Sequence, residues 1–379
     1  MKITRIGRVS SIALVGALAL SACGSDNNTG SGGSGDGSSS AAQSGDQAGA
    51  GNVDCGTKPI KGEGSTAQDN AIQEAIASFK EVCPDQSVTY NGTGSGNGIR
   101  QFIAKQVNFA GSDSALKSSD GKTEQADADK ACGSPAWNLP MVTGPIAVAY
   151  NLEGVDKLVL TPGLIADIFN GKITKWNDPA IAAVNKGVKL PAQDIKVFFR
   201  SDESGTTENF TKYLAASAKD KWTAEPAKKW SGKGEGKAKT AGVTNAVKTT
   251  PGGITYAEWS SAKDNDLGMA LIDNGAGPVE LTGESASKAV AAAKPAGEGN
   301  NLKLKLDYAT KQPGAYPIIL VTYEVVCSKY ADPEIGKGVK AFLNHFGSAD
   351  TQKSLEDVGY APLPAEIQSK VETAVNAIQ

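Results

Sequence analysis

The segment IKVFFRSDESGTTENF, residues 195–210, passes from an apolar run through a polar turn into a helical pattern. The apolar run predicts a strand, and the residues after the turn predict a helix at 205–217. The turn itself contains Arg200, Asp202 and Ser204 among small hydroxylated residues. A turn of this kind can hold an anion, a metal ion or a nucleophile, or it can serve only as a helix cap.

Two other segments have the same form: a predicted strand, a turn rich in Gly, Ser and Thr, and a predicted helix. They are GEGST at 62–66 and GTGSGNG at 92–98. Each turn places unpaired backbone N–H groups at the positive end of a helix, with a hydroxyl group beside them. A single such turn is usually a plain cap, but parallel sheets gather these turns at one edge, where ligands bind. Three turns in one chain, one of them with an arginine, therefore favour an anion site.

The order of the apolar and helical patterns predicts the fold class. Strands alternate with helices, which is typical of an α/β protein with largely parallel sheets. The length of 379 residues suits two domains of ~150 residues each. One long apolar run is expected to be broken by Gly144-Pro145, and Ser65 or Thr66 is expected to cap the first helix. The predicted strands are 57–63, 87–92, 107–113, 139–151, 195–199 and 315–326, and the predicted helices are 65–83, 92–107, 163–171, 205–217, 334–346 and 366–378.

The N-terminus has the pattern of an export signal. Lys2, Arg5 and Arg8 precede the short apolar core SIALVGALAL, and LSAC ends the segment at Cys23. The apolar core is too short to be a permanent membrane helix. Residues 1–22 are therefore predicted to be a signal peptide. LSAC resembles the bacterial lipobox, in which the cysteine is acylated and becomes the first residue.

Residues 23–54 are predicted to be a lipid-anchored, disordered linker. After the cysteine the segment is almost entirely Gly, Ser, Asp, Asn, Gln, Ala and Thr, which cannot bury enough surface to fold. A flexible coil of this length spans roughly 30 Å. The whole chain has a net charge of −3 and no basic stripe, so nucleic acid is not expected as a partner.

The remaining cysteines and the single histidine argue against metal and Ser–His chemistry. An even number of cysteines in an exported chain predicts two disulfides, with three pairings open, and none of them has the CxxC spacing of a zinc site. His345 lies in the helical pattern KAFLNHF and is predicted to be a surface or boundary residue. We therefore expect no metal, no cofactor and no catalytic residue.

Three familiar motifs also fail on inspection. GEGSTA matches a dinucleotide fingerprint, but the second predicted strand ends in Asn91-Gly92 rather than in the required acid. In SGKGEGKAKT, Gly232-Lys233 is followed by Gly and Gly236-Lys237 by Ala, where a phosphate loop requires Ser or Thr. Neither Ser95 nor Ser204 has glycines two residues to either side, as a hydrolase elbow requires.

The segments GEGST, YNGTGSGNGIRQF, FAGSD, FNGKITKWNDPAIAAVN, RSDESGTT and GYAPLP follow one another in this order. From about residue 58 to its end the chain resembles the phosphate-binding proteins of bacterial ATP-driven phosphate uptake transporters. The resemblance implies a two-domain periplasmic-binding-protein fold with the ligand in the interdomain cleft. The runs 139–151 and 315–326 would then be the hinge-crossing strands, domain one would be 57–143 with 320–379, and domain two would be 144–319.

The resemblance also implies the residues that bind phosphate. Arg200 would supply a planar cation, and Asp202 would hold its guanidinium in place. Asp113 would accept the proton that phosphate carries and sulfate lacks; its other interpretation is a cap for the turn SDSALK. The implied ligands are the hydroxyls or N–H groups of Thr66, Ala67, Ser95, Ser204, Gly205 and Thr206, together with Asp113 and Arg200.

The implied architecture further pairs Cys55 with Cys83 and Cys132 with Cys327, because the members of each pair lie on one side of the same unit. It implies a monomer that is anchored by lipid at the extracytoplasmic face of the cell membrane and delivers phosphate to the permease subunits of the importer. One alternative is a binding protein for another oxyanion, sulfate or molybdate. A secreted phosphatase is a weaker alternative, since no base or metal cluster accompanies the turn serines.

Overall fold

The computed structural model describes residues 53–118, 121 and 123–379. The predicted signal peptide, Cys23 and most of the predicted linker lie outside the described residues. The strands are β1 Ile60–Gly64, β2 Val88–Gly92, β3 Phe109–Ser112, β4 Ala136–Tyr150, β5 Val159–Leu160, β6 Lys196–Arg200, β7 Glu235–Lys237, β8 Gly253–Glu258, β9 Gly268–Met269, β10 Leu271–Asp273, β11 Pro278–Val279, β12 Lys294–Pro295, β13 Leu304–Lys305 and β14 Ile319–Cys327.

Helices separate and follow these strands along the described residues, and most present one apolar face to a sheet. The helices are α1 Asp69–Val82, α2 Ser95–Ile103, α3 Glu124–Cys132, α4 Pro162–Phe169, α5 Pro179–Val184, α6 Gly205–Ser217, α7 Lys239–Lys248, α8 Trp259–Asp264, α9 Gly283–Ala291, α10 Pro333–Phe346, α11 Ala349–Asp357 and α12 Ala365–Asn376. None of these described helices is both long and apolar enough to span a membrane.

One large mixed sheet organises the fold. Its strand order is β2-β1-β3-β14-β4-β8-β6-β7, and β9 pairs with β4. The outer pairs are parallel, as predicted, but β14 and β4 run antiparallel to each other and to their outer neighbours β3 and β8. The expectation of largely parallel sheets therefore holds for the two ends of the sheet and is wrong for its centre.

The two central strands carry the chain from one end of the sheet to the other. The predicted break at Gly144-Pro145 does not occur, because β4 is continuous through both residues. Pro145 is instead the last residue of β4 in register with β14, and Ile146 is the first in register with β8. The proline thus marks the residue at which β4 changes its partner.

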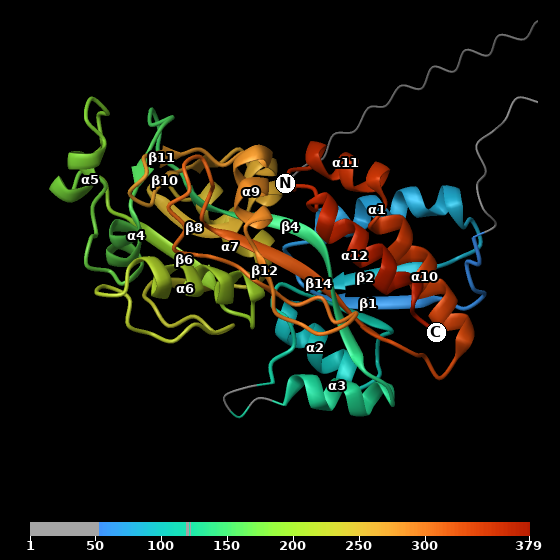
Figure 1. The fold of residues 1–379 in the computed structure, drawn as a ribbon. Coiled ribbons are helices and arrows are strands. Elements are labelled where there is room, and N and C mark those ends of the chain that lie inside the picture. The colour runs from blue at the N-terminus through green and yellow to red at the C-terminus, as the bar shows by residue number, and fades with distance from the viewer. Residues whose placement is uncertain (1–52, 119–120, 122) are drawn as a thin grey trace, which may run out of the picture. The chain divides into compact units, whose positions relative to one another are not determined.

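Each end of the sheet has its own hydrophobic core. At the β2–β1–β3 end the core includes Phe79, Phe109 and Phe342, and α1, α10 and α12 cover one face while α2 and α3 lie on the other (Figure 1). At the β8–β6–β7 end the core includes Trp176 and Phe210, packed among α4, α6 and α7. A third, smaller cluster, which includes Phe102 and Val325, lies at the first end on the face of α2 and α3. The cores at the two ends, joined by the crossing strands, give the α/β, two-lobed architecture that was predicted.

The structure joins Cys55 to Cys83 and Cys132 to Cys327, the two pairs that the resemblance implied. Their Cα atoms lie 5.8 Å and 5.4 Å apart, within the usual range for a disulfide. The first disulfide ties the chain entering β1 to the end of α1. The second ties the end of α3 to the end of β14.

Candidate functional site

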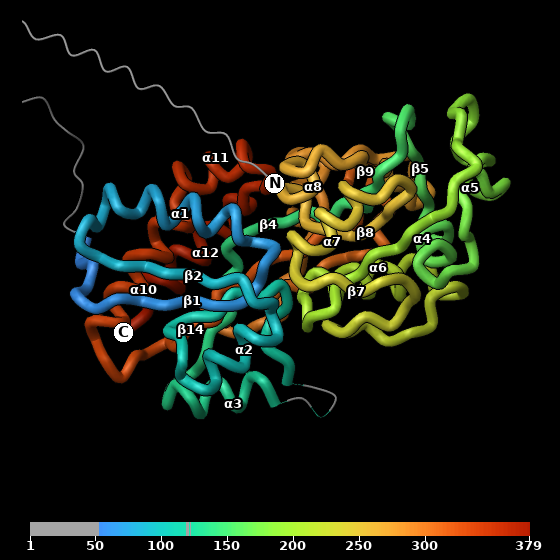
Figure 2. The backbone as a smooth tube through the Cα atoms, turned by 180° about the vertical axis from the view of Figure 1, so that it is seen from behind, coloured from blue at the N-terminus to red at the C-terminus, as the bar shows by residue number. Residues whose placement is uncertain are grey.

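Four helices begin near one another where the two ends of the sheet meet. Helices α1 and α2 follow β1 and β2, and Figure 2 shows these strands running toward the part of the molecule that carries α7. Helix α6 follows β6, and α7 follows β7. Because the first N–H groups of a helix have no partner within it, this arrangement concentrates unpaired donors and positive helix ends at one place.

The carboxylate of Asp113, just beyond β3, lies at the centre of this region and is only 3% exposed. Its Oδ1 accepts hydrogen bonds from Ser65 Oγ and from Thr322 Oγ1, the latter at 2.8 Å. Its Oδ2 accepts from Ser95 Oγ at 3.3 Å and from Thr206 Oγ1 at 3.4 Å. Asp113 is therefore surrounded by hydroxyl groups from four separate segments of the chain.

Burial raises the pKa of Asp113 above its ordinary value, and several neighbours oppose this rise. Hydrogen bonds from Ser65 and Thr322 lower the pKa, and so does the positive charge of Arg200. The net direction is upward, because hydroxyl groups compensate only partly for the lost water. A buried carboxylate that is held in this way can share a proton with a ligand.

Arg200, at the end of β6, is the buried cation of the site and is 2% exposed. Its Nε donates to Asp202 Oδ1 at 2.8 Å, its Nη2 donates to Asp202 Oδ2, and its Nη1 donates to Thr240 Oγ1 at 3.2 Å. Burial pushes the pKa of Asp202 upward, but the hydrogen bond and charge of Arg200 outweigh it and leave that pKa below its ordinary value. The guanidinium is thus fixed in one orientation by a charged partner.

The first predicted turn is connected to Arg200 through the hydroxyl group of Thr240. Thr66 Oγ1 lies 2.7 Å from Thr240 Oγ1, which also accepts from Arg200. The N–H of Ala67 donates to Ser65 Oγ at 3.0 Å, so Ser65 links this turn to Asp113 as well. The prediction that Ser65 or Thr66 caps the first helix is wrong. The N-cap of α1 is Gln68, and its side chain makes no capping hydrogen bond.

The start of α6 approaches the other turns closely enough to require a glycine. A Cβ atom on Gly205 would lie 2.6 Å from both Asp113 Cβ and Ser95 Oγ. Ser204, which the resemblance assigned to the ligand, is the N-cap of α6, and its Oγ accepts from the N–H of Thr207 at 3.2 Å. Asn209, one turn further along, donates to the backbone oxygen of Asp113 at 2.7 Å. The helix is therefore held against Asp113 at two levels.

All the side chains that the resemblance assigned to the ligand are buried in this region, and hydrogen bonds or close packing connect them. Sequence reasoning missed four further residues here: Ser65, Thr240, Thr322 and Asn209. Ser65 was considered only as a cap, and Thr322 is the one threonine within the apolar run PIILVTYEVV, which is the signal that could have been used. Thr240 and Asn209 carry no comparable signal.

Other chemistry finds little support in the described residues. They contain no cluster of three or more His, Cys, Asp or Glu side chains that could hold a metal ion. His345 contacts Ser78 Oγ at 2.8 Å between α10 and α1 and is half-buried, as expected of a boundary residue. The groups that do converge are hydroxyls, N–H groups, an arginine and a carboxylate, and this combination suits a protonated oxyanion.

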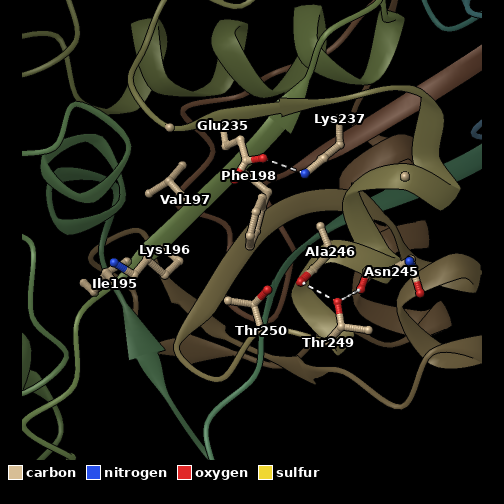
Figure 3. A pocket seen from close by; sticks show the side chains of 12 residues that line it. Ile195, Lys196, Val197, Phe198, Glu235, Lys237, Asn245, Ala246, Thr249 and Thr250 are labelled. Atoms are coloured by element: carbon tan, nitrogen blue, oxygen red, sulfur yellow. Dashed lines mark hydrogen bonds and ion pairs between the residues drawn. The ribbon is translucent and has the colours of Figure 1, made fainter.

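A separate surface pocket of about 560 Å³ lies beside β6 and α7 (Figure 3). Phe198, Glu235 and Lys237 are among its lining residues. Two of its three charged lining residues are paired with each other, Lys237 Nζ lying 2.6 Å from Glu235 Oε1, and the third is Lys196. None of the residues assigned to the ligand lines this pocket, so it is distinct from the region around Asp113.

Comparisons with known proteins agree with this geometry. The family model described as the PBP superfamily domain matches residues 34–350. The chain is 47% identical to "Phosphate-binding protein PstS3" of Mycobacterium bovis (strain BCG / Pasteur 1173P2), with all of both chains covered. It is 34% identical to "Phosphate-binding protein PstS" of Haemophilus influenzae over 81% of this chain and 93% of that protein.

Among solved structures, the high-affinity periplasmic phosphate-binding protein PfluDING, with phosphate bound, has a TM-score of 0.68 at 22% identity. The alignment covers 83% of this chain and 93% of that one. This likeness shows the fold, which is the two-domain periplasmic-binding-protein class. The chain belongs to the PBP superfamily and, within it, to the family of PstS phosphate-binding proteins.

Proposed function

We propose that this protein captures inorganic phosphate between its two lobes and delivers it to an ABC-type phosphate importer. The observation that supports the proposal most strongly is the pairing of a buried cation, Arg200, with a buried proton acceptor, Asp113, in a single hydroxyl-lined region. Dibasic and monobasic phosphate both need donors for their bare oxygens and an acceptor for their proton. The names of the relatives point to the same ligand.

In this proposal Arg200 Nη1 and the N-termini of α1, α2 and α6 bind the bare phosphate oxygens. The hydroxyls of Thr66, Ser95, Ser204 and Thr206 and the N–H groups of Ala67 and Gly205 complete the set of donors. Several of these groups now bond to one another, as in the pair Thr66–Thr240 and the bond from Ala67 to Ser65. Binding would replace those bonds with bonds to phosphate.

Asp113 would supply selectivity against oxyanions that carry no proton. Sulfate at neutral pH would place a bare oxygen against the carboxylate, with no hydrogen bond to offset the repulsion. The surroundings of Asp113 support this role, because its four side-chain partners are hydroxyl groups, which leave its charge unneutralised. The other interpretation, a simple cap of the next turn, does not account for this set of partners.

We further propose the domain bounds 57–143 with 320–379 for domain one and 144–319 for domain two. The change of partner along β4 at Pro145 and Ile146 supports the first crossing. The separate hydrophobic cores at the two ends of the sheet support both crossings, the one along β4 and the one along β14. The ligand would then lie between the domains, with Asp113 from one and Arg200 from the other.

We propose that a lipid on Cys23 anchors the protein at the extracytoplasmic face of the membrane, with residues 24–54 as a tether, and that the protein acts as a monomer with the importer's permease subunits as partners. Replacing Cys23 with Ser should release the protein into the medium with its phosphate affinity unchanged. Retention of the variant in the membrane fraction would place the anchor elsewhere.

A melting experiment tests the proposed ligand. Phosphate should raise the melting temperature, because a ligand that binds only the folded protein stabilises it by mass action. Sulfate, molybdate and chloride at equal ionic strength serve as the comparison and should have little effect. An equal rise with sulfate would indicate a general oxyanion-binding protein, and an unchanged melt in millimolar phosphate would contradict the proposal.

A further inference from the structure

A chain of hydrogen bonds connects a buried glutamate to the first ligand turn. Glu258 ends β8, caps α8 and is 1% exposed. Its carboxyl group contacts Ser260 Oγ, which lies 3.1 Å from Tyr360 Oη. Tyr360 Oη in turn donates to the backbone oxygen of Ala67 at 2.8 Å. The series of hydrogen bonds therefore ends on the carbonyl group of Ala67, the residue whose N–H is assigned to phosphate.

This chain crosses from one proposed domain to the other. Glu258 and Ser260 lie within 144–319, whereas Tyr360 and Ala67 belong to the other domain. Tyr360 is the tyrosine of GYAPLP, and this motif contributes no residue to the ligand set. A second contact runs beside it, since Asn70 Nδ2 donates to Ser260 Oγ at 3.1 Å.

Counting donors and acceptors gives the direction of each hydrogen bond in the series from Glu258 to Ala67. A serine hydroxyl donates one hydrogen bond and accepts two. If Ser260 accepts from Asn70 and from a protonated Glu258, its single proton is free to go to Tyr360, and the proton of Tyr360 goes to Ala67. Every lone pair and proton of Ser260 is then used. If Glu258 is ionised, the proton of Ser260 turns toward the carboxylate and the bond that crosses to Tyr360 is lost.

We propose that Tyr360, Ser260 and neutral Glu258 are positioning residues, which hold the first phosphate turn against the opposite domain and so slow the release of phosphate. This inference rests on the proposed function. None of the three residues needs to touch phosphate. They act through Ala67, whose carbonyl they fix, and they do so only when the two domains are together.

The electrostatics of the region agree with a neutral Glu258. Burial raises its pKa to about 8, and the negative charge of Asp113 contributes to the rise, although hydrogen bonds from Ser260 and Ser261 oppose it. The other charged groups around these residues are Asp69, whose charge acts on Tyr360, Asp264, which accepts from Asn70 at 2.8 Å, and Lys263 of α8, whose side chain lies against Gly359. The acids do not favour ionisation of Glu258, and the ammonium group of Lys263 lies over the ring of Trp259, 5.2 Å from its centroid.

The test measures the release of phosphate from the full-length protein. Bound radiolabelled phosphate is displaced with excess unlabelled phosphate, and equilibrium dialysis gives Kd, from which the association rate follows. The main variant is Tyr360→Phe. Tyr330→Phe is the matched control, because Tyr330 Oη also donates to a backbone oxygen, that of Asn108, at 2.8 Å, but within one domain.

Tyr360→Phe should release phosphate about three- to tenfold faster than Tyr330→Phe, with a similar association rate, which is the effect of one lost hydrogen bond in the closed form. Ser260→Ala should behave like Tyr360→Phe. Equal release rates for Tyr360→Phe and Tyr330→Phe would overturn the positioning role while the proposed function stands. A parent protein that binds no phosphate would overturn both.

A second readout separates positioning from a general structural role. The release rate of the parent, divided by that of Glu258→Gln at the same pH, should rise between pH 7 and pH 9, because the amide of Gln cannot lose its donor whereas Glu258 can. The ionisation of phosphate itself cancels in this ratio. A ratio that stays constant across this range would contradict the assignment of donors and acceptors around Ser260, on which the proposed series of hydrogen bonds depends.

Discussion

Arg200 and Asp113 are both almost fully buried in the same region, but their surroundings differ. Arg200 has an ionised partner, Asp202. The hydrogen bond and the positive charge of Arg200 lower the pKa of Asp202 and keep it charged. Asp113 has no such partner in the part of the chain that the structure describes; its side-chain partners are hydroxyl groups from Ser65, Ser95, Thr206 and Thr322. The cation is fixed as a permanent charge, whereas the acid can accept a proton.

This difference shows how a site for an anion can contain an acid. A carboxylate paired with a cation would be a poor proton acceptor, and a carboxylate without donors would simply become protonated. Glu324, on β14, illustrates the second case: among the described residues neither of its carboxyl oxygens has a partner within hydrogen-bond geometry, and burial raises its pKa to about 8, although the neighbouring side chain of Gln68 lowers it. Asp113 lies between these cases, which suits a group that shares a proton with a ligand.

The largest effect is expected from removing the fixed cation. Arg200→Ala should weaken phosphate binding by ~1.5–3 kcal/mol or more, the scale of a hydrogen bond to a charged group left unmade. Calorimetric titration measures the change. Arg100→Ala is the matched control, because Arg100 also pairs with an acid but its side chain is 60% exposed. Equal affinities for the two variants would remove Arg200 from the site.

The next effect concerns selectivity. Asp113→Asn keeps the shape, removes the charge and adds a donor, so the affinity for sulfate relative to phosphate should improve by a shift on the order of 1–3 kcal/mol. Competition between the two anions in equilibrium dialysis gives the ratio directly. A variant that rejects sulfate as strongly as the parent does would show that Asp113 is not the discriminator.

A smaller effect is expected from the hydroxyl groups around Asp113. Thr322→Val removes the donor at 2.8 Å and keeps the shape, so phosphate binding should weaken by about 1 kcal/mol. The control is Thr255→Val, which removes a buried hydroxyl that donates to the backbone oxygen of Phe198 instead. If both variants bind phosphate like the parent, the hydroxyl groups do not support Asp113 in the proposed way.

The smallest effect on binding, close to zero, should come from Glu324→Gln, because neither carboxyl oxygen of Glu324 bonds to a residue assigned to phosphate. Its effect should appear in stability instead. Glu324 stays protonated in the folded protein up to a pKa of about 8, while the unfolded chain ionises near 4.5. Between these values the folded form binds more protons, so stability falls as pH rises.

Melting curves from pH 5 to pH 8 check this second part. The melting temperature of Glu324→Gln should fall less over this range than that of the parent, because the variant has no group to ionise at this position. Parallel curves would mean that Glu324 is not held neutral. Asp113, with its four hydroxyl partners, would then be less distinct from Glu324 than their surroundings indicate.

The bounds of a helix could be predicted from the sequence where a single local pattern determines them. Helix α6 begins and ends at the predicted residues 205 and 217, because its cap and apolar spacing both lie within the segment. Helix α7 was missed, since KTAGVTNAVK has few apolar residues and begins at Lys239 with a positive φ of 63°. Thr240, which bonds to Arg200, was missed with it.

The partners of Asp113 show why the rest of the site could not be predicted. Thr322 reaches Asp113 only because β14 pairs antiparallel with β3, Tyr323 lying in register with Ser112. That pairing joins segments far apart in the sequence, and no local pattern encodes it. Ser95 and Thr206 were assigned through the resemblance, and both lie in the first turn of a helix, within the local motifs that carry that resemblance.

The phosphate-bound structure of the protein tests the central claim most directly. We predict one phosphate between the domains, with one oxygen within about 3 Å of the Asp113 carboxylate and another within about 3 Å of the Arg200 guanidinium. The short contact to Asp113 would show a shared proton, since two bare oxygens would repel each other. Phosphate bound elsewhere, or bound with its oxygens more than about 4 Å from Asp113, would contradict the account.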